Sequence, residues 1–432
     1  LPDSSREFKM VWNAATIGGR PLEFPGSQPR WLRKPRTGDL FASQQDPMDA
    51  LVPGLDDIST SIVALVDSGS VLLSAPLVYH FADPVRGDMQ VPFTLAPGIA
   101  INFERQNELA RAGVSRRRFF NVTVRSAFPN AREVTLSLRV PRGLSVDSAS
   151  RTVTVSPNGA RTVTFRVTGA LSAGDHEVSA IATSGGKSYD VGYVAISYDH
   201  IPPLRMYRPA KVQITSVPVS VPPGLNIGYV RGVGDNVPAT LQDLGIPVTT
   251  VSPADLPSTD LSRFTTIVVG TRAYQANQQL IDNNSYLLEF VRNGGTLVSQ
   301  YGQYEMVQPG VMPYPITLAR PAERVTDETA EVRITDAASP LLSFPNRITL
   351  ADFNGWTQER ASYMPATFDA SYKSVLSMND RGESPKNSGI LVAPYGKGVY
   401  VYTTLAFFRQ LPAANPGATR LFVNLLSAKS GR

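Results

Sequence analysis

Apolar and polar residues alternate with a period of two along residues 119–199. Successive side chains of a β-strand point to opposite faces, so this alternation predicts strands with one buried and one exposed face. Turn residues such as Ser156-Pro-Asn-Gly and Ser184-Gly-Gly separate the strands. About seven such strands predict an immunoglobulin-like β-sandwich over residues 108–199. Its inward positions include Phe120, Val122, Val124, Val134, Leu136, Leu138, Val163, Phe165 and Val167.

A different pattern begins at residue 225, where apolar runs alternate with glycine-containing loops and amphipathic stretches. The runs 225–230, 248–251, 266–270 and 296–301 predict strands, and 237–244 and 280–291 predict helices that stop at glycines. Strands that alternate with helices indicate a mainly parallel sheet covered on both faces. Later strands at 332–334, 375–378, 390–393 and 399–403, with a closing helix at 417–426, complete a flavodoxin-like α/β domain over residues 225–432.

The flanking segments carry weaker patterns. Short apolar runs broken by turn signals such as Asp83-Pro predict a small β-rich module over residues 46–107. Residues 200–224 hold six prolines and predict a semi-rigid connector. Residues 1–45 are rich in proline and arginine, lack lasting periodicity, and predict an extended arm. The fold class is therefore multidomain: a β-rich N-terminal region, an immunoglobulin-like sandwich and an α/β domain.

The arm carries the candidate partner-binding residues. Large aromatic side chains in a non-compact segment need a surface to bury against, and aromatic and Arg residues are common anchors of protein interfaces. These residues either pack on the chain's own next domain or dock onto another protein. The set is Trp12, Phe24, Trp31, Arg33, Lys34 and Arg36.

Composition excludes several functions. The 432 residues carry 41 basic and 36 acidic side chains, a net charge of +5, which is mild and disfavours nucleic-acid binding. The absence of cysteine removes disulfides, thiolate zinc sites and Cys nucleophiles. No apolar stretch is long enough for a membrane helix. Because Leu1 replaces an initiator Met and no signal-peptide pattern follows, we expect a processed or excised product.

Candidate ligand sites lie at the carboxyl ends of the predicted parallel strands, where open α/β sheets bind ligands. The loops to inspect are 231–236, 271–274, 299–305 and 405–410. The first belongs to the stretch Gly228-Tyr-Val-Arg-Gly-Val-Gly-Asp-Asn-Val-Pro, which matches neither the dinucleotide fingerprint nor the P-loop. Its glycines serve either a turn or an anion bound by backbone N–H groups.

Several motifs resemble the C-terminal part of large bacterial PIG-L family deacetylases. They are Tyr79-His-Phe-Ala-Asp-Pro-Val-Arg-Gly, Asp199-His-Ile, Arg324-Val-Thr-Asp-Glu-Thr, Asp352-Phe-Asn-Gly-Trp-Thr-Gln-Glu-Arg and Ala393-Pro-Tyr-Gly-Lys-Gly-Val-Tyr-Val-Tyr-Thr-Thr-Leu. The likeness spans most of residues 60–430. In that family a zinc-dependent N-deacetylase domain with His-Pro-Asp-Asp and His-x-x-His motifs precedes these modules. Neither motif occurs here, and His80, His176 and His200 are dispersed, so the resemblance carries no deacetylase activity to this chain.

The α/β domain also resembles class I glutamine amidotransferase-like and ThuA-like domains. In those domains a nucleophile elbow follows a strand after a Gly-Gly turn, and a His commonly follows a later strand. Here the elbow region reads Leu297-Val-Ser-Gln-Tyr-Gly-Gln-Tyr-Glu, without Cys, and Phe407 stands near the expected His. A nucleophile without a base cannot lose its proton at neutral pH, so we expect a degenerate site and no acyl transfer.

Carboxylates and aromatic residues gather near the same sheet edge. Asp327 with Glu328 and Asp352 with Glu359 are either glycoside acid/base pairs or solvated and Arg-paired carboxylates, and the second reading is the ordinary one. Aromatic residues there form core, a protein interface or a glycan platform. The candidate degenerate-site pocket comprises Tyr301, Tyr304, Trp356 and Phe407.

The sequence therefore predicts no catalytic residues, no metal site and no cofactor. The leading hypothesis is a non-catalytic extracytoplasmic structural or interaction protein, attached as an extrinsic subunit or scaffold to a larger complex, such as a respiratory or photosynthetic membrane complex. The alternative is a carbohydrate-binding accessory region of a PIG-L-type polysaccharide deacetylase. A hydrolase that uses Asp352 and Glu359 is a third, weaker hypothesis.

Overall fold

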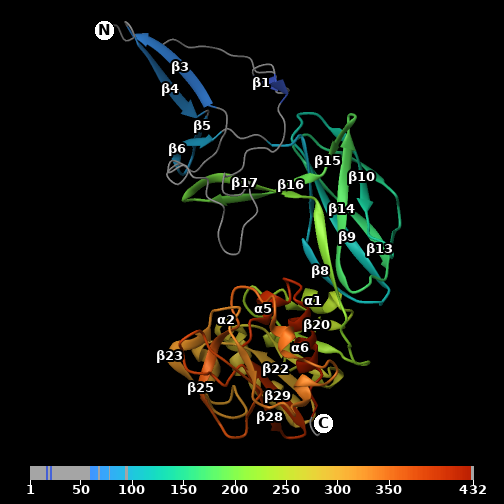
Figure 1. Cartoon of the computed structure of the whole chain (residues 1–432), viewed down its shortest axis with the longest axis vertical. Coiled ribbons are helices and arrows are strands. Elements are labelled where there is room, and N and C mark those ends of the chain that lie inside the picture. The colour runs from blue at the N-terminus through green and yellow to red at the C-terminus, as the bar shows by residue number, and fades with distance from the viewer. Residues whose placement is uncertain are drawn as a thin grey trace.

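The computed structural model describes residues 16–17, 20–21, 59–66, 69–76, 78–92 and 96–429 (Figure 1). The arm residues Trp12, Phe24, Trp31, Arg33, Lys34 and Arg36 lie outside these ranges. Two short strands pair within the arm, β1 (Thr16–Ile17) and β2 (Arg20–Pro21). Among the described residues, no helix is long and apolar enough to cross a membrane.

Two antiparallel hairpins follow, in the region where the sequence predicts short strands. β3 (Ser59–Val66) pairs with β4 (Gly69–Pro76), and β5 (Val78–Asp83) pairs with β6 (Gly87–Pro92). The turn of the second hairpin depends on Asp83, whose carboxylate accepts from the N–H groups of Val85 and Arg86, both at 2.8 Å. The Asp-Pro turn signal is therefore confirmed as an Asx-type turn.

Two sheets then form a β-sandwich. One has the order β11-β13-β9-β7, with β7 (Ile99–Phe103), β9 (Arg116–Ser126), β11 (Leu144–Val146) and β13 (Ala160–Gly169). The other has the order β12-β10-β14-β18-β8, with β8 (Asn107–Arg111), β10 (Arg132–Arg139), β12 (Arg151–Val155), β14 (Gly174–Ser184) and β18 (Lys211–Val217). β15 (Lys187–Tyr189) pairs antiparallel with the end of β14. The alternating residues Phe120, Val122 and Val124 are buried between the sheets, as their pattern predicts.

The sandwich is wider than residues 108–199. It begins with β7 and β8, whose residues belong mostly to the expected N-terminal module, and ends with β18, which lies in the expected connector 200–224. The connector prediction is therefore wrong for 211–217: this stretch contains no proline, and its alternating Val212 and Ile214 are buried. β18 pairs in parallel with β8, across about a hundred residues of sequence.

The remaining prolines of that segment sit where β-structure tolerates them. β16 (Val191–Tyr198) and β17 (Ile201–Pro209) form a separate two-stranded hairpin, labelled beside the sandwich in Figure 1. Proline cannot donate to a strand ladder, so it is confined to edges, bulges and strand ends. Both strands of a two-stranded hairpin are edge strands, which explains how β17 accommodates its prolines.

The C-terminal domain is built on a seven-stranded sheet of order β20-β19-β21-β22-β29-β28-β26. The parallel strands are β19 (Ile227–Val230), β20 (Val248–Thr250), β21 (Thr266–Val269), β22 (Thr296–Gln300) and β29 (Gly398–Thr403). β28 (Ile390–Tyr395) and β26 (Lys373–Ser374) continue it antiparallel. The mainly parallel sheet predicted from the sequence is present.

Helices cover both faces of this sheet. α1 (Val237–Asp243) and α6 (Pro416–Leu426) contribute to one apolar core, and α4 (Asn284–Arg292) contributes to the other. α2 (Ala273–Ala276), α3 (Gln278–Asp282) and α5 (Phe407–Gln410) are short. Alternate residues of β21 serve the two cores, with Val268 in the first and Ile267 and Val269 in the second. Such two-sided burial explains the nearly continuous apolar runs of the parallel strands.

Two of the predicted later strands do not join this sheet. β24 (Val332–Ile334) and β27 (Leu376–Met378) pair only with each other, and β23 (Ile316–Val325) pairs with β25 (Ala361–Phe368). The positions of the predicted strands at 332–334 and 375–378 are confirmed, and the structure places them in a separate two-stranded ladder. Short apolar runs indicate a strand without indicating its partner.

The sandwich and the α/β domain share an apolar core. Leu109 of β8 and Val217 of β18 belong to the same buried cluster as Val237, Leu241 and Leu244 in and beside α1. The segment between the domains is also fixed, because Asn346 accepts from the Ser220 N–H at 2.8 Å and donates to the Ser220 carbonyl at 3.0 Å. This joint is therefore packed and hydrogen-bonded, unlike a solvated linker.

Charged groups surround this apolar contact. Arg105 forms an ion pair with Asp243, with one guanidinium nitrogen 2.8 Å from a carboxylate oxygen. Arg116 donates to the main-chain oxygen of Asp243 at 2.5 Å and also to that of Gln242. These carbonyls lie at the C-terminal end of α1, where helix carbonyls lack partners and a cation is favourable. Both arginines therefore attach the sandwich to the end of α1.

A buried carboxyl group lies in the same joint. Glu108 is 9% exposed and close to Asp243, Arg105, Arg118 and Arg116. Burial, followed by repulsion from Asp243, raises its pKa to about 7, against the opposing attraction of the three arginines. Desolvation disfavours the charged form of an acid, and here it outweighs the nearby positive charges.

We predict that Leu109→Ala destabilises the α/β domain as well as the sandwich, by about 2–5 kcal/mol, because it opens a cavity in the shared core. Urea unfolding followed by the fluorescence of Trp356, with Trp12 and Trp31 replaced by Phe, measures the effect on the α/β domain. The control is Ile101→Ala, which opens a cavity only in the sandwich core. Equal effects of both variants on the Trp356 signal would contradict a shared core.

We predict that Glu108→Gln flattens the pH dependence of stability. The folded-state pKa of Glu108 lies above its ordinary 4.5, so its stabilising contribution is complete below that value and is lost as the pH rises through about 7. The Tm of the wild type should therefore fall relative to Glu108→Gln between about pH 5 and about pH 8. Glu104→Gln is the control because Glu104 is exposed. Parallel pH profiles for the wild type and Glu108→Gln would refute the prediction.

Candidate functional site

The carboxyl ends of the parallel strands form the candidate site. Numbered along the chain, the five parallel strands have the spatial order 2-1-3-4-5, so the order reverses between β19 and β21. At such a reversal the adjacent loops leave in opposite directions and normally open a ligand-binding crevice. The loop after β19 and the start of the loop after β21 meet at this point.

The chain's own Asp235 occupies this crevice. Its buried carboxylate accepts from the Tyr229 hydroxyl at 2.7 Å, the Gly232 N–H at 3.2 Å and the Val237 N–H at 3.1 Å. Burial and then the Asp235 charge raise the pKa of Tyr229 well above its ordinary value, so Tyr229 stays a donor. Gln300 completes the network by donating to the Tyr229 hydroxyl at 2.9 Å.

Glycine is required on both sides of this carboxylate. A Cβ on Gly270 would lie 2.1 Å from an Asp235 oxygen, and a Cβ on Gly232 would lie 2.1 Å from the Thr271 carbonyl oxygen. Gly232 and Gly270 therefore allow the two loops to approach each other closely around the Asp235 carboxylate. The sequence left open whether these glycines serve a turn or an anion site. In the structure the loop N–H groups of Gly232 and Val237 bind a carboxylate, and that carboxylate is the side chain of Asp235.

The four residues of the predicted pocket separate into two groups. The Tyr301 ring stacks on Tyr363 with centroids 5.9 Å apart and planes at 3°, and the Tyr304 ring meets Tyr363 edge-on at 6.2 Å. Trp356 and Phe407 lie in the apolar core, 4% and 0% exposed. Their membership of a pocket is therefore wrong, because buried rings that pack on one another present no surface to a ligand.

Backbone strain gathers around the tyrosines. Arg272, Gln358 and Tyr363 adopt positive φ values of 57°, 68° and 51°, a region that side chains other than glycine, Asn and Asp rarely occupy. Such strain clusters at functional sites, although it does not identify the function. We refer to Tyr301, Tyr304 and Tyr363 as the tyrosine cluster.

Arginines pack around the tyrosine cluster. The Arg320 guanidinium lies 3.8 Å from the centre of the Tyr304 ring. Arg409 donates to Glu359 at 2.8 Å and also to Gln358. Burial, followed by repulsion from the nearby Glu359 charge, raises the pKa of Tyr301, which therefore remains a neutral phenol. Tyr301 is buried, whereas Tyr304 and Tyr363 are half-buried, so only these two rings of the cluster present surface to a ligand.

The positions that the amidotransferase resemblance predicts to be catalytic hold other groups. β22 leads into Tyr301, and Phe407 is buried against Trp356 and Phe422 with ring centroids at 5.9 and 4.9 Å. The phenylalanine that stands near the expected His is therefore part of the core. It offers no base to a neighbouring nucleophile.

The candidate carboxylates are bound within the protein. Asp352 caps a turn by accepting from Thr349 and lies 3.3 Å from Arg420, and Glu359 is held by Arg409. Asp327 accepts from the Thr329 N–H and hydroxyl at 2.7 and 2.6 Å. The Arg-paired interpretation is therefore confirmed for Asp352 and Glu359, and Asp327 serves a local turn.

The histidines lie in separate places. His80 contacts Asp88 at 2.5 Å, His176 contacts the Ser172 carbonyl at 2.8 Å, and His200 packs on Tyr198. Within the described residues, no group of three or more His, Cys, Asp or Glu side chains is arranged to hold a metal ion.

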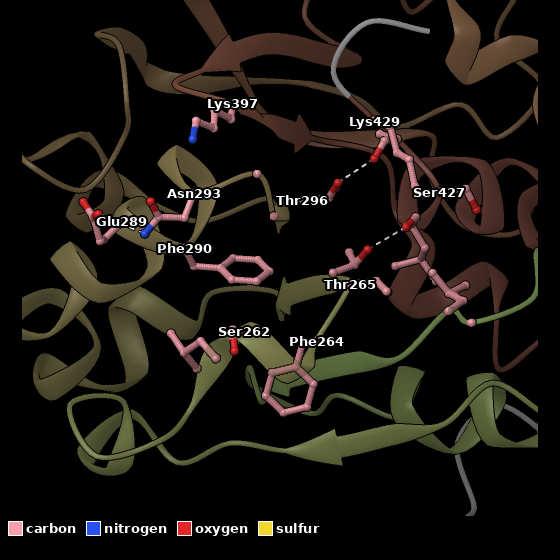
Figure 2. A pocket seen from close by; sticks show the side chains of 18 of the residues that line it. Ser262, Phe264, Thr265, Glu289, Phe290, Asn293, Thr296, Lys397, Ser427 and Lys429 are labelled. Atoms are coloured by element: carbon pink, nitrogen blue, oxygen red, sulfur yellow. Dashed lines mark hydrogen bonds between the residues drawn. The ribbon is translucent and has the colours of Figure 1, made fainter.

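A cavity of about 970 Å³ opens on the opposite side, near the amino ends of the parallel strands (Figure 2). The rings of Phe264 and Phe290 form part of its wall, and Lys397 and Lys429 also line it. Thr296 donates to the Ala428 carbonyl at 2.5 Å and fixes the last described residues beside the cavity. Sequence reasoning missed this cavity because it looked for ligands only at the carboxyl ends of the strands.

Sequence reasoning also missed Asp235. The signal was present as an Asx residue directly after a Gly-Val-Gly run and before a helix that starts with proline. The glycines alone do not show that the loop N–H groups bind the carboxylate of Asp235 in the same loop.

No protein-family model and no curated protein matches this chain. Solved structures align with parts of it. A fragment of native alpha-2-macroglobulin from Escherichia coli has 11% identity and a TM-score of 0.19, over 28% of this chain and 17% of that one. A FixG-related protein from Vibrio parahaemolyticus has 12% identity and a TM-score of 0.19, over 28% and 94%. A β-galactosidase from Rahnella sp. R3 has 14% identity and a TM-score of 0.27, over 49% and 32%. Likeness at this level assigns no family.

We predict that Asp235→Ala lowers stability by roughly 3 kcal/mol or more, because it leaves a buried hydroxyl and two N–H groups without an acceptor. Sulfate should raise the Tm of this variant more than that of the wild type, since an external anion can then bind those donors. Asp260→Ala, which removes an exposed capping carboxylate, is the matched control. An equal sulfate effect on all three proteins would contradict an internal anion in the crevice.

Proposed function

We propose that this chain is a non-catalytic extracytoplasmic structural or interaction protein, an extrinsic subunit or scaffold of a larger complex. The observation that carries the proposal is the filled crevice between β19 and β21. Asp235 and the close approach of Gly232 to Gly270 occupy the place where an open α/β sheet normally binds its ligand. A fold can retain its packing after its site is lost, and its surfaces then carry the function.

We propose that the domain is a degenerate relative of flavodoxin-like and amidotransferase-like folds, and that the sandwich is immunoglobulin-like. The strand order 2-1-3-4-5 supports the first relationship, since flavodoxin-like sheets have this order. The motif resemblance to the C-terminal part of PIG-L deacetylases supports an extracytoplasmic location and an association with other modules. The complex can be a respiratory or photosynthetic membrane assembly that the chain contacts from outside.

The tyrosine cluster supports the alternative function, a carbohydrate-binding accessory region. Aromatic and cationic groups lie together here: the half-buried Tyr304 and Tyr363, the buried Tyr301 that stacks on Tyr363, and the Arg320 guanidinium over the Tyr304 ring. Aromatic faces bury the apolar face of a sugar, and Arg donors bind its oxygens. This alternative places ligand binding on the tyrosine cluster, away from the filled crevice.

We predict that the native chain migrates on a non-denaturing gel with other subunits of its source and that deletion of residues 1–40 weakens this association. Trp12, Phe24, Trp31 and the basic residues of the arm supply the expected anchors. The Tm of the remainder should change little, because the sequence predicts an extended arm for residues 1–45 rather than part of a packed core. Migration of the full chain alone, or a large fall in Tm with association intact, would contradict the proposal.

A second variant replaces Arg33, Lys34 and Arg36 with Gln and keeps the aromatic residues of the arm. It separates the contribution of the basic run, which should depend on salt, from that of the apolar anchors. Glycan arrays with Tyr363→Ala as the negative variant test the carbohydrate alternative.

A further inference from the structure

A second cleft lies between the sandwich, the β16–β17 hairpin and α1. It has a volume of about 930 Å³, within the range of roughly 300–1,000 Å³ typical of ligand sites. Its walls come from the β7–β8 turn, from β16 and β17, from α1 and from the ends of β9 and β18. The lining residues used below are Asn102, Glu104, Arg105, Arg125, Arg208 and Lys211.

Positive charge dominates this cleft. Its lining includes the basic residues Arg105, Arg125, Arg205, Arg208 and Lys211, and the only acidic residue that the structure describes in the lining is Glu104. Asp243 neutralises Arg105, and Glu177 pairs with Lys211 at 3.0 Å. The walls therefore keep an excess of positive charge after these ion pairs are counted.

Two arginines have uncompensated charges. Arg125 is exposed, and its guanidinium has no hydrogen-bond or ion-pair partner within the described part of the chain. Arg208 donates to the Gln106 side-chain oxygen and, at 3.6 Å, to the Met206 sulfur. Both of these partners are neutral, so they orient the Arg208 guanidinium without neutralising it.

The hairpin that closes the cleft is held in place. Asn102 of β7 donates to the Tyr193 carbonyl at 3.2 Å, and a Cβ on Gly192 would lie 1.9 Å from the Asn102 side-chain oxygen. The Arg205 guanidinium packs 5.4 Å from the centre of the Tyr193 ring. β16 therefore lies directly against the sandwich, and the basic side chains project from a preformed wall.

We propose that this cleft binds a small ligand that carries two or more oxyanion groups, carboxylates or phosphates. Arginine forks bind both groups bidentately, and the enclosed walls strengthen the attraction relative to an open surface. The cleft is bounded on several sides and the chain's net charge is only +5, which favours a compact oligoanion over a long nucleic acid. This inference is independent of the scaffold proposed above.

Isothermal titration of the full chain at low salt tests the proposal, with pyrophosphate, citrate and trigalacturonate as probes and neutral maltotriose as the uncharged comparison. We expect binding of at least one charged probe and none of maltotriose. Arg125→Gln and Arg208→Gln should each weaken that binding by roughly tenfold, and the double variant by more. Preference among the probes distinguishes a phosphate ligand from a free or glycan-borne carboxylate ligand.

Arg139→Gln is the matched control, because Arg139 is an exposed arginine on β10 outside the cleft. Thermal unfolding of each variant establishes that the fold is intact, and failure of Arg208→Gln to fold leaves Arg125→Gln as the deciding variant. No binding of any charged probe, or equal losses in Arg125→Gln and Arg139→Gln, would overturn the proposal. Equal binding of maltotriose would also overturn it, because charge would then play no part.

Discussion

The packing of β8 and β18 against α1 is the contact on which the rest of this structure depends. Leu109 and Val217 belong to sandwich strands, but their side chains pack in the apolar core of the α/β domain. Because close-packed interiors do not deform continuously, this contact sets one orientation for the two domains. Arg116 then binds the free carbonyls at the end of α1, Arg105 pairs with the Asp243 carboxylate, and the basic cleft lies beside the joint.

The same joint places a buried acid among arginines. Glu108 and Arg118 are each less than one-tenth exposed. Desolvation raises the pKa of Glu108 and lowers the pKa of Arg118, so it favours the neutral form of each side chain. Buried charges are more often costly than stabilising unless each is fully paired. The apolar contact therefore stabilises the joint, while the buried Glu108 makes the joint sensitive to pH.

The parallel strands of the α/β domain have the order 2-1-3-4-5, and Asp235 fills the point where this order reverses. Asp235 binds backbone N–H groups that could have received an external anion, and Gly270 allows the approach. The aromatic residues near this edge belong to two separate groups of packed rings. Phe407 and Trp356 support the core, and Tyr301 and Tyr304 pack around the strained Tyr363.

The sequence by itself determined the local elements, because alternation and glycine stops depend on neighbouring residues. The α1 and α6 helices, the parallel strands β19, β21, β22 and β29, and the Asx turn at Asp83 all follow from short patterns. Only the tertiary structure decided which distant segments meet. The alternation of residues 211–217 is local, but their parallel pairing with β8 is not, and no short pattern shows that Trp356 and Phe407 pack inside the core. Pairing, burial and the filling of a crevice are contacts between residues far apart in the chain, so no short window of sequence contains them.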